Sequence, residues 1–295
     1  MAREVREAAG VLKTAGWNLS LTQSQNAAQV TELAREAAQA GWEAVFVAGG
    51  DGTLGGAVAG LMGSDTALGV LPTGTTNVWA KEIGLQAGRI RLVDNARHLS
   101  AGKEWLADIG LCNEKPFMLW AGFGLDARVI ERLERRRNRL MKFFNEIYYL
   151  ATIWRCAVGW RGIPVQITAD GQPVEGWMLQ VLACNIRYYA GSILSPHSKW
   201  DDAKLELWAL RSGSKGGVGT VIRHLWNLGY RQHVRENEVV CLPFRQAHIT
   251  FKTEEWMHLD GEPYGTIQQA HLAIRAKALK VLVPETRPEP TSTFA

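Results

Sequence analysis

Cysteine is scarce in this chain, and the cysteines that it has form no pattern. Cys112, Cys156, Cys184 and Cys241 lie far apart, without a C-x-x-C pair. That spacing fits neither a zinc site nor a disulfide framework, so a reducing cytoplasm is the simplest location. The seven histidines do not fall at metal-ligand spacing either, and we interpret them as surface or core residues.

Long apolar runs and a strong net charge are also missing. No uncharged apolar segment reaches the roughly 20 residues that cross a bilayer. The first residues, Met1 to Glu7, are charged and helical in character, unlike a signal peptide. The net charge of +4 is small, which argues against a nucleic-acid partner. We therefore expect a soluble cytoplasmic protein, and attachment to the inner face of the membrane stays open.

The composition that is present is that of an ordinary globular protein. Of the 295 residues, 46% are apolar and 21% are charged, which is enough for a sizeable core. The length is long for one domain and comfortable for two.

The first hundred residues alternate between helical and strand patterns. Helices are expected at 5–14, 27–40 and 54–62, and a further helix follows residue 77 and runs through Lys81. Strands are expected at 17–21, 43–48 and 67–71. This order predicts an α/β fold with a doubly wound parallel sheet over residues 1–108. Ligands of such a sheet bind at the carboxyl ends of its strands.

After about Asp108 the pattern changes to short alternating segments. They lie at 117–121, 163–169, 178–184, 205–210, 248–252, 256–259, 272–275 and 281–283, with helical stretches around 128–158 and 217–230. The pattern predicts an antiparallel, β-sandwich-like second domain over residues 109–280. Residues from about 280 to 295 are candidates to rejoin the first domain. The proline-rich tail from Pro284 is predicted to be disordered.

The most informative segment is an apolar strand that runs into a glycine turn, V-F-V-A-G-G-D-G-T at residues 45–53. Gly49, Gly50 and Gly52 allow a sharp turn that brings backbone N–H groups close to a ligand. A helix follows, and its N-terminus is a favourable place for phosphate. Asp51 adds a carboxylate that could hold a metal ion or take a proton. The alternative is a tight βα turn without a ligand.

The same turn contains the string G-x-G-x-x-G at residues 50–55, which is a weak signal of dinucleotide binding. Asp51 would repel a pyrophosphate, and no acidic residue ends a strand about twenty residues later. A Walker A loop is also absent, because Glu104 follows Gly102-Lys103. A carboxylate inside a phosphate-binding turn is better explained by Mg²⁺, which neutralises both groups during phosphoryl transfer.

A second turn, L-P-T-G-T-T-N at residues 71–77, precedes another helix. Thr75 supplies a hydroxyl and Asn77 an amide at the helix N-terminus, where both could contact a ligand. The alternative is that Thr76 or Asn77 simply caps the helix.

Taken together, these motifs resemble the catalytic domain of diacylglycerol and sphingosine kinases. The first two blocks are Gly49-Gly50-Asp51-Gly52-Thr53 and residues 71–77 with Ala80. The later blocks are Gly122-Phe123-Gly124-Leu125-Asp126-Ala127, Asn185 with Gly191 and Pro196, Asp202 with Leu205-Glu206, and Asp260-Gly261-Glu262. They occur in family order from residue 22 to about 283. The chain is most similar to the bacterial soluble lipid kinases of two domains.

The resemblance implies a role for each matching residue. ATP and Mg²⁺ are the implied cofactors, with ATP on the first domain. The implied nucleotide-binding residues are Thr22, Gly49, Gly50, Asp51, Gly52, Thr53, Thr75 and Asn77. Asp51 would position the metal and the γ-phosphate, and Glu262 or Asp260 would take the proton from a lipid hydroxyl. In an extended segment these two carboxylates share one face, although Asp260-Gly261 could also be a plain surface turn.

A second implied metal ligand is Asp202, helped by backbone carbonyls near Lys199 and Lys204. The family's Asp-Gly at this place is Asp202-Ala203 here, so the backbone geometry of this site is open.

The start of the chain departs from the family as well. The family opens with a strand that ends in an Asn-Pro motif plus a glycine, and this sequence begins inside the following helix. We expect an upstream coding segment that supplies the strand; the other explanation is a genuine loss. Two alternatives to an active lipid kinase therefore stay open. One is a NAD kinase-like enzyme, and the other is a catalytically weak or inactive lipid-binding regulatory protein.

Residues 131–160 bear on the substrate. A cluster of arginines and Lys142 leads into an apolar stripe that includes Phe144, Trp154 and Val158 at helical spacing. The stripe could face the core, or the basic end could rest on anionic lipid headgroups and guide an acyl chain. The expected partner is a lipid substrate at the membrane surface, and a homodimer stays open.

Overall fold

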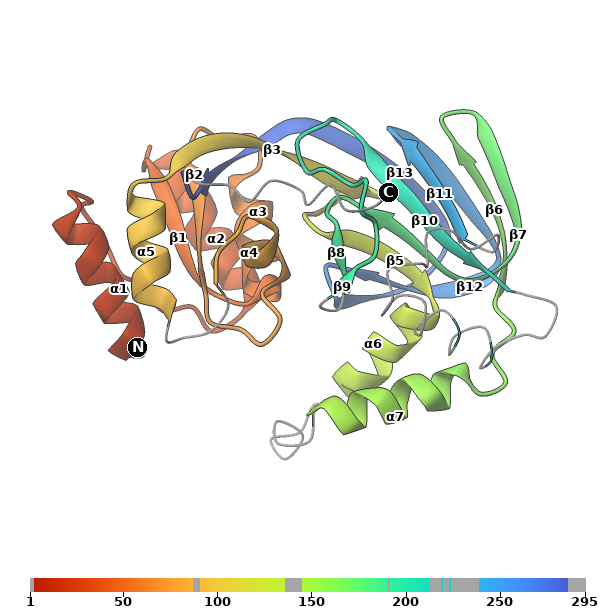
Figure 1. The fold of residues 1–295 in the computed structure, drawn as a ribbon. Helices are drawn as coiled ribbons and strands as arrows, with labels where there is room; N and C mark the ends of the chain where they lie inside the picture. The colour runs from red at the N-terminus through yellow and green to blue at the C-terminus, as the bar shows by residue number, and fades with distance from the viewer. Residues whose placement is uncertain are drawn as a thin grey trace. The chain divides into compact units, whose positions relative to one another are not determined.

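The computed structural model describes residues 3–86, 91–135, 145–189, 192–212, 219, 223 and 239–285. The chain forms two compact units (Figure 1). Unit 1 contains residues 1–109, 200–202 and 275–295, and unit 2 contains residues 110–199 and 203–274. Among the described helices, none is both long enough and apolar enough to cross a bilayer.

Unit 1 is built on a short parallel sheet. Strand β1 (Ala44–Gly49) pairs in parallel with β2 (Ala67–Pro72), and Val281 near the end of β13 (Glu262–Val283) pairs in parallel with Leu68 of β2. All six residues of β2 are buried, as expected for a parallel strand that is covered on both faces.

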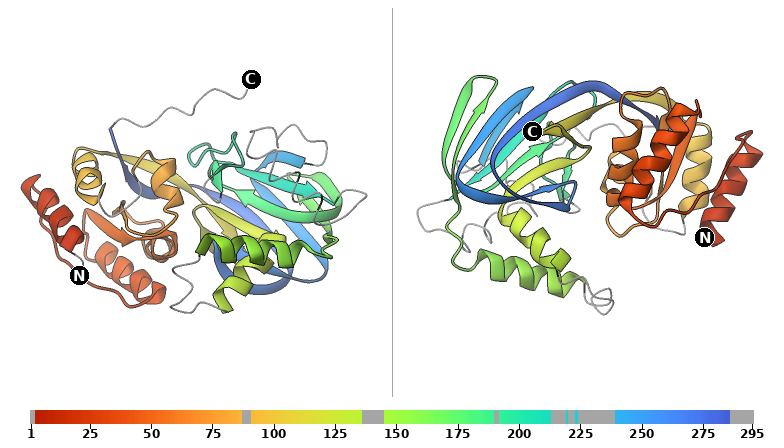
Figure 2. Two further views of the ribbon diagram at one scale, coloured as in Figure 1. Left: turned by 60° about the horizontal axis from the view of Figure 1, so that its bottom comes forward. Right: turned by 180° about the vertical axis from the view of Figure 1, so that it is seen from behind.

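Five helices surround this sheet in the part of unit 1 that the structure describes. They are α1 (Arg3–Thr14), α2 (Ala27–Gln39), α3 (Asp51–Leu61), α4 (Val78–Glu82) and α5 (Leu92–Ser100). Helices α2 and α3 pack on each other, as do α1 and α5. The two pairs lie on opposite sides of β1 and β2 (Figure 2), which is the doubly wound arrangement predicted from the sequence.

The strand predicted at residues 17–21 is wrong. Residues 17–24 form neither helix nor strand, and Leu21 is 48% exposed. Alternation of apolar and polar residues shows only that a segment suits a sheet, whereas a strand also needs a neighbour with which to pair. Trp17 instead packs edge-on against Phe46 of β1, with ring centroids 5.1 Å apart.

Unit 2 is an antiparallel β structure. Its strands are β4 (Lys115–Phe117), β5 (Trp120–Gly124), β6 (Ile163–Ala169), β7 (Gln172–Cys184), β8 (Tyr188–Tyr189), β9 (Ser192–Ile193), β10 (Leu205–Arg211), β11 (Val239–Phe244) and β12 (Gln246–Leu259). β13 belongs mostly to this unit, and β3 (Lys103–Cys112) leads into it from unit 1.

The strands of unit 2 enclose an apolar core. β5 and β6 each pair with both β7 and β12, while β10 lies between β7 and β11. Alternate residues of β6, from Ile163 to Ala169, point inward and are buried with Phe123, Phe251 and Leu272. This architecture confirms the predicted second part of the fold, an antiparallel β-sandwich-like domain.

The predicted helix at 128–158 is two helices, α6 (Leu125–Arg135) and α7 (Asn145–Ala157), with the residues between them outside the described part. Helix α6 packs on α7 and on strands β5, β7 and β12. The second predicted helix, at 217–230, lies outside the described residues except for 219 and 223, which are helical.

Candidate active site

The first glycine turn joins β1 to α3. β1 ends at Gly49 and α3 begins at Asp51, with Gly50 as an extended N-cap residue (φ −99°, ψ −176°). Because glycine has no side chain, it cannot accept a hydrogen bond from the first turn of the helix. The N-terminus of α3 therefore offers backbone N–H groups and the positive end of the helix dipole to an anion.

The two glycine turns lie against each other. Thr73 donates its N–H to the carbonyl of Gly49 at 3.0 Å. A Cβ atom added to Gly74 would lie 2.7 Å from the Cα of Gly50 and 2.9 Å from Oδ1 of Asn77. Such distances are too short for any side chain, so glycine at position 74 is a condition of this contact.

Asp51 connects the two turns. Its Oδ1 accepts hydrogen bonds from the N–H groups of Val78 (2.9 Å) and Trp79 (3.3 Å), which are the first residues of α4. Burial raises the pKa of the Asp51 carboxyl, and the hydrogen bonds from Val78, Trp79 and the Thr76 side chain oppose that rise. Asp51 thus caps α4 from a distant part of the sequence.

The Asn77 side chain forms hydrogen bonds within its own turn. Its backbone is left-handed (φ 46°), its Oδ1 accepts from the N–H of Gly74 at 3.0 Å, and its Nδ2 donates to the carbonyl of Gly74 at 2.7 Å. The amide therefore closes its own turn. Binding of nucleotide by this side chain remains a prediction that the geometry does not strengthen.

The other predicted nucleotide residues divide into two groups. Gly49, Gly50, Asp51, Gly52 and Thr53 come together in the first turn, and Thr75 is exposed on the turn beside it. Thr22 is exposed in the segment 17–24, which forms no helix or strand.

In unit 2, Asp260 and Gly261 form the turn of the β12–β13 hairpin. Both have positive φ (53° and 83°), and Leu259 pairs directly with Glu262 across the turn. Asp-Gly is the favoured pair for a two-residue turn of this kind. The segment is therefore a tight turn, as one of the two interpretations predicted. Whether it also has a catalytic role depends on the carboxylates of Asp260 and Glu262.

The two carboxylates of the hairpin have different surroundings. Asp260 accepts hydrogen bonds from the N–H groups of Met118 (2.8 Å), Leu119 (2.8 Å) and Trp120 (3.0 Å). Glu262 is exposed at the start of β13. A carboxylate that binds three backbone N–H groups is a poor proton acceptor, so the geometry favours Glu262 over Asp260 as a base.

The second predicted metal site, around Asp202, has the weakest structural support. Asp202 is exposed in unit 1, and Lys199 and Lys204 are exposed in unit 2. Ala203 has φ +59°, so it keeps the left-handed backbone for which glycine is better suited. Within the described residues there is no group of three or more His, Cys, Asp or Glu side chains that could hold a metal ion. Metal binding by Asp202 remains a prediction.

Family models match both parts of the sequence. The diacylglycerol kinase catalytic domain matches residues 1–112, and the YegS C-terminal NAD kinase beta sandwich-like domain matches residues 120–283. The chain belongs to the diacylglycerol kinase family.

Curated relatives in the diacylglycerol kinase family cover nearly the whole chain. The diacylglycerol kinase of Bacillus subtilis is 26% identical over 278 residues, which is 93% of this chain and 89% of the relative. A probable lipid kinase YegS-like protein of Chromohalobacter salexigens is 28% identical over 282 residues, covering 88% of this chain and 82% of the relative. A solved diacylglycerol kinase structure from Bacillus anthracis has a TM-score of 0.71 at 17% identity, covering 96% of this chain and 91% of that one.

As a member of a kinase family, the chain is expected to use a nucleotide as phosphoryl donor. The N-terminus of α3 fits phosphate groups, because its N-cap residue is a glycine and no side chain caps the N–H groups of its first turn. The Asp51 carboxylate beside them is the donor type that Mg²⁺ prefers.

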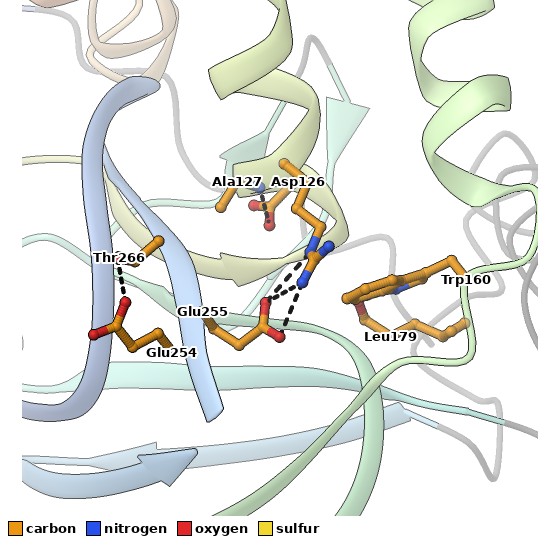
Figure 3. Close-up of polar contacts among 8 residues, drawn as sticks. Asp126, Ala127, Trp160, Leu179, Glu254, Glu255 and Thr266 are labelled. Atoms are coloured by element: carbon orange, nitrogen blue, oxygen red, sulfur yellow. Dashed lines mark hydrogen bonds and ion pairs between the residues drawn. The ribbon is translucent and has the colours of Figure 1, made fainter. Parts of the chain in front are cut away.

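Two polar clusters of this diacylglycerol kinase family member were missed by the sequence reasoning. The first joins His258 to Asp126 and Tyr189 and lies at the base of the β12–β13 hairpin. In the second, Arg128 donates to both oxygens of Glu255 (3.0 and 2.9 Å), and its guanidinium lies 4.3 Å from the Trp160 ring centroid (Figure 3). Asp126 belongs to the motif at residues 122–127, so the sequence did mark one member of the first cluster. The second cluster joins residues far apart in the sequence, which no pattern indicates.

Proposed function

We propose that this chain is an ATP- and Mg²⁺-dependent lipid kinase that transfers the γ-phosphate to a hydroxyl of diacylglycerol or a similar lipid. In this proposal unit 1 binds the nucleotide and unit 2 binds the lipid. The observation that carries it is the pair of glycine turns in unit 1, joined by the Asp51 carboxylate at the uncapped N-terminus of α3.

Unit 1 supplies the groups that phosphoryl transfer needs. The N–H groups around Gly50 and Gly52 and the hydroxyl of Thr75 would hold the phosphates. Mg²⁺, when bound, would neutralise charge on the phosphates, and Asp51 is the carboxylate that would hold it. The contact between Asp51 and α4 fixes the carboxylate before any ligand arrives, which lowers the cost of positioning it.

Unit 2 supplies the proton acceptor. Glu262 is exposed, whereas the Asp260 carboxylate is bound by three N–H groups. We therefore assign to Glu262 the removal of the proton from the lipid hydroxyl, and to Asp260 the fixing of the hairpin on which Glu262 stands.

Exposed side chains at the C-terminal end of α7 and just beyond it are consistent with a lipid substrate. Trp154 and Val158 are one helical turn apart and are 53% and 55% exposed, so a core-facing role for the apolar stripe is wrong at these positions. Arg155 and Arg161 beside them are exposed as well. Apolar side chains flanked by arginines are typical of a surface that rests on anionic lipid, which would place the protein at the inner face of the membrane.

A substrate panel tests the proposal. The purified protein would be incubated with γ-labelled ATP, Mg²⁺ and, in separate reactions, diacylglycerol vesicles, vesicles of other hydroxyl-bearing lipids, and NAD. Label on a lipid supports the proposal. Label on NAD would replace it with the NAD kinase-like alternative, and label on neither substrate would favour a lipid-binding regulatory protein. Asp51→Asn serves as the matched control for contaminating kinases.

A further inference from the structure

The base of the β12–β13 hairpin contains a buried polar cluster that the proposed reaction does not use. His258 is 0% exposed and lies two residues before the Asp260-Gly261 turn. Its Nε2 is 2.7 Å from Oδ2 of Asp126, and its Nδ1 accepts from the N–H of Gly261 at 3.3 Å. The imidazole therefore connects the hairpin turn to the N-terminus of α6.

The hydrogen bonds define the tautomer of His258. Nδ1 faces an N–H group and must accept, so the ring proton lies on Nε2 and is donated to Asp126. Asp126 is bound by further donors, the hydroxyl of Tyr189 at 3.0 Å and the N–H of Ala127 at 2.8 Å (Figure 3 shows the last of these). Each nitrogen of the ring and each oxygen of the carboxylate thus has a partner.

The local backbone is adapted to this cluster. Gly122 of β5 pairs with His258, and a Cβ atom at position 122 would lie 2.0 Å from Nε2 of His258 and 2.5 Å from Oδ2 of Asp126. The β12–β13 register also shifts between Met257 and His258. Register shifts of this kind re-aim side chains and are frequent beside active sites.

The cluster acts on the element that bears Glu262. Gly261 is held by His258, while Asp260 is held by the N–H groups of residues 118–120 and donates its own N–H to the carbonyl of Trp120 at 2.9 Å. Hydrogen bonds with His258 and with residues 118–120 therefore fix both residues of the turn. Glu262 follows them directly, so its backbone position depends on these contacts.

We propose that His258 is a positioning residue for Glu262, acting through the N–H of Gly261 and held in its tautomer by Asp126. This inference rests on the proposed function, in which Glu262 takes the proton. His258 cannot touch the substrate itself, because it is fully buried. Loss of its Nδ1 acceptor would leave the Gly261 N–H without a partner and let the turn move, and a displacement of about 1 Å at a catalytic group can cost about a hundredfold in rate.

Two variants separate the roles of the two imidazole nitrogens of His258. In His258→Asn the amide oxygen replaces Nδ1 and keeps the acceptor for Gly261, whereas in His258→Gln the amide nitrogen replaces Nε2 and keeps the donor to Asp126. We expect kcat of His258→Gln to fall by about ten- to a hundredfold, with the KM for ATP unchanged, while His258→Asn keeps most of its kcat. Glu254→Gln is the control, since it alters an exposed hydrogen bond to Thr266 on the same strand pair.

Hydrogen exchange of the Gly261 amide gives a readout that needs no activity. We expect slow exchange in the wild type and in His258→Asn and fast exchange in His258→Gln. Equal losses of kcat and of thermal stability in both variants would mean that His258 is only a structural core residue, and would overturn the inference. So would fast exchange of Gly261 in the wild type. If the wild type phosphorylates no lipid, the proposed function fails, and the exchange pattern alone then decides whether His258 holds the turn.

Discussion

Asp51 accepts hydrogen bonds from the first N–H groups of α4 while it stands in the turn that we assign to phosphate. One carboxylate therefore serves two purposes, since it fixes the second glycine turn and places negative charge where a cation is needed. These purposes can be separated, because the contact with α4 needs only an acceptor oxygen and the contact with a cation needs the charge.

We expect Asp51→Asn to lower kcat by at least about a hundredfold, because a charge aimed at the transferring phosphoryl group is lost. The fold should be retained, because the amide oxygen of asparagine can replace Oδ1 as the acceptor for Val78 and Trp79. Steady-state kinetics and thermal unfolding would measure the two effects separately. An unchanged rate with normal Mg²⁺ dependence would make Asp51 a turn residue only.

The raised pKa of Asp51 predicts a pH dependence of stability. The folded state holds the proton more tightly than the unfolded state, whose pKa is near the ordinary 3.8. The free energy of unfolding should therefore fall as the pH rises from that value through the raised pKa. Urea unfolding without nucleotide, at several pH values, would show the wild type losing stability relative to Asp51→Asn over this window. A difference that stays constant with pH would exclude Asp51 as the cause.

At the scale of elements, the β12–β13 hairpin shows how two neighbouring carboxylates come to differ. Asp260 lies in the left-handed backbone of the turn, and its side chain reaches the N–H groups of the buried residues 118–120. Glu262 begins the next strand and is exposed. Their spacing of two residues puts both on one face only in an extended segment, whereas here Asp260 lies in the turn itself and Glu262 pairs with Leu259 at the start of the next strand.

This difference predicts opposite phenotypes for two isosteric changes. Asp260→Asn brings an amide NH₂ group towards at least one backbone N–H group, and it should lower the free energy of unfolding by about 1–3 kcal/mol. Glu262→Gln should leave that free energy unchanged and lower kcat by at least about a hundredfold. Urea unfolding and kinetics on the same preparations would measure both. A stable Asp260→Asn without turnover would instead identify Asp260 as the base.

Much of the element order could be predicted from the sequence. Helix α2 and strand β6 follow clear periodicity, and the glycine turns lie where strand patterns end. The contacts that complete the site could not be predicted in this way. The bond from Val78 to Asp51 spans 27 positions, and the contact of His258 with Asp126 spans 132. Periodicity shows which face of a helix or strand is buried, but it does not show which residues from distant parts of the sequence contact that face.

At the scale of the whole molecule, the proposed lipid substrate stays in a bilayer, so under that proposal the protein has to reach the bilayer surface. Exposed large apolar side chains are found in both units, at Trp42 and Trp105 in unit 1 and at Trp154, Val158 and Trp177 in unit 2. Only some of them can serve membrane contact, because such a surface needs apolar and basic groups together. The C-terminal end of α7 and the residue that follows it have this combination, since Arg155 lies between Trp154 and Val158 in the sequence and is exposed.

We expect the double change Trp154→Ser and Val158→Ser to lower activity on long-chain diacylglycerol in anionic vesicles by about tenfold, because less apolar surface would be buried in the lipid. Activity on a short-chain, water-soluble diacylglycerol should be unchanged, since that substrate needs no membrane contact. Trp177→Ser is the matched control, because Trp177 is 55% exposed, close to the 53% of Trp154, and lies on β7. Equal losses on both substrates would show that α7 shapes the lipid pocket, and an equal effect of Trp177→Ser would show a general loss of apolar surface.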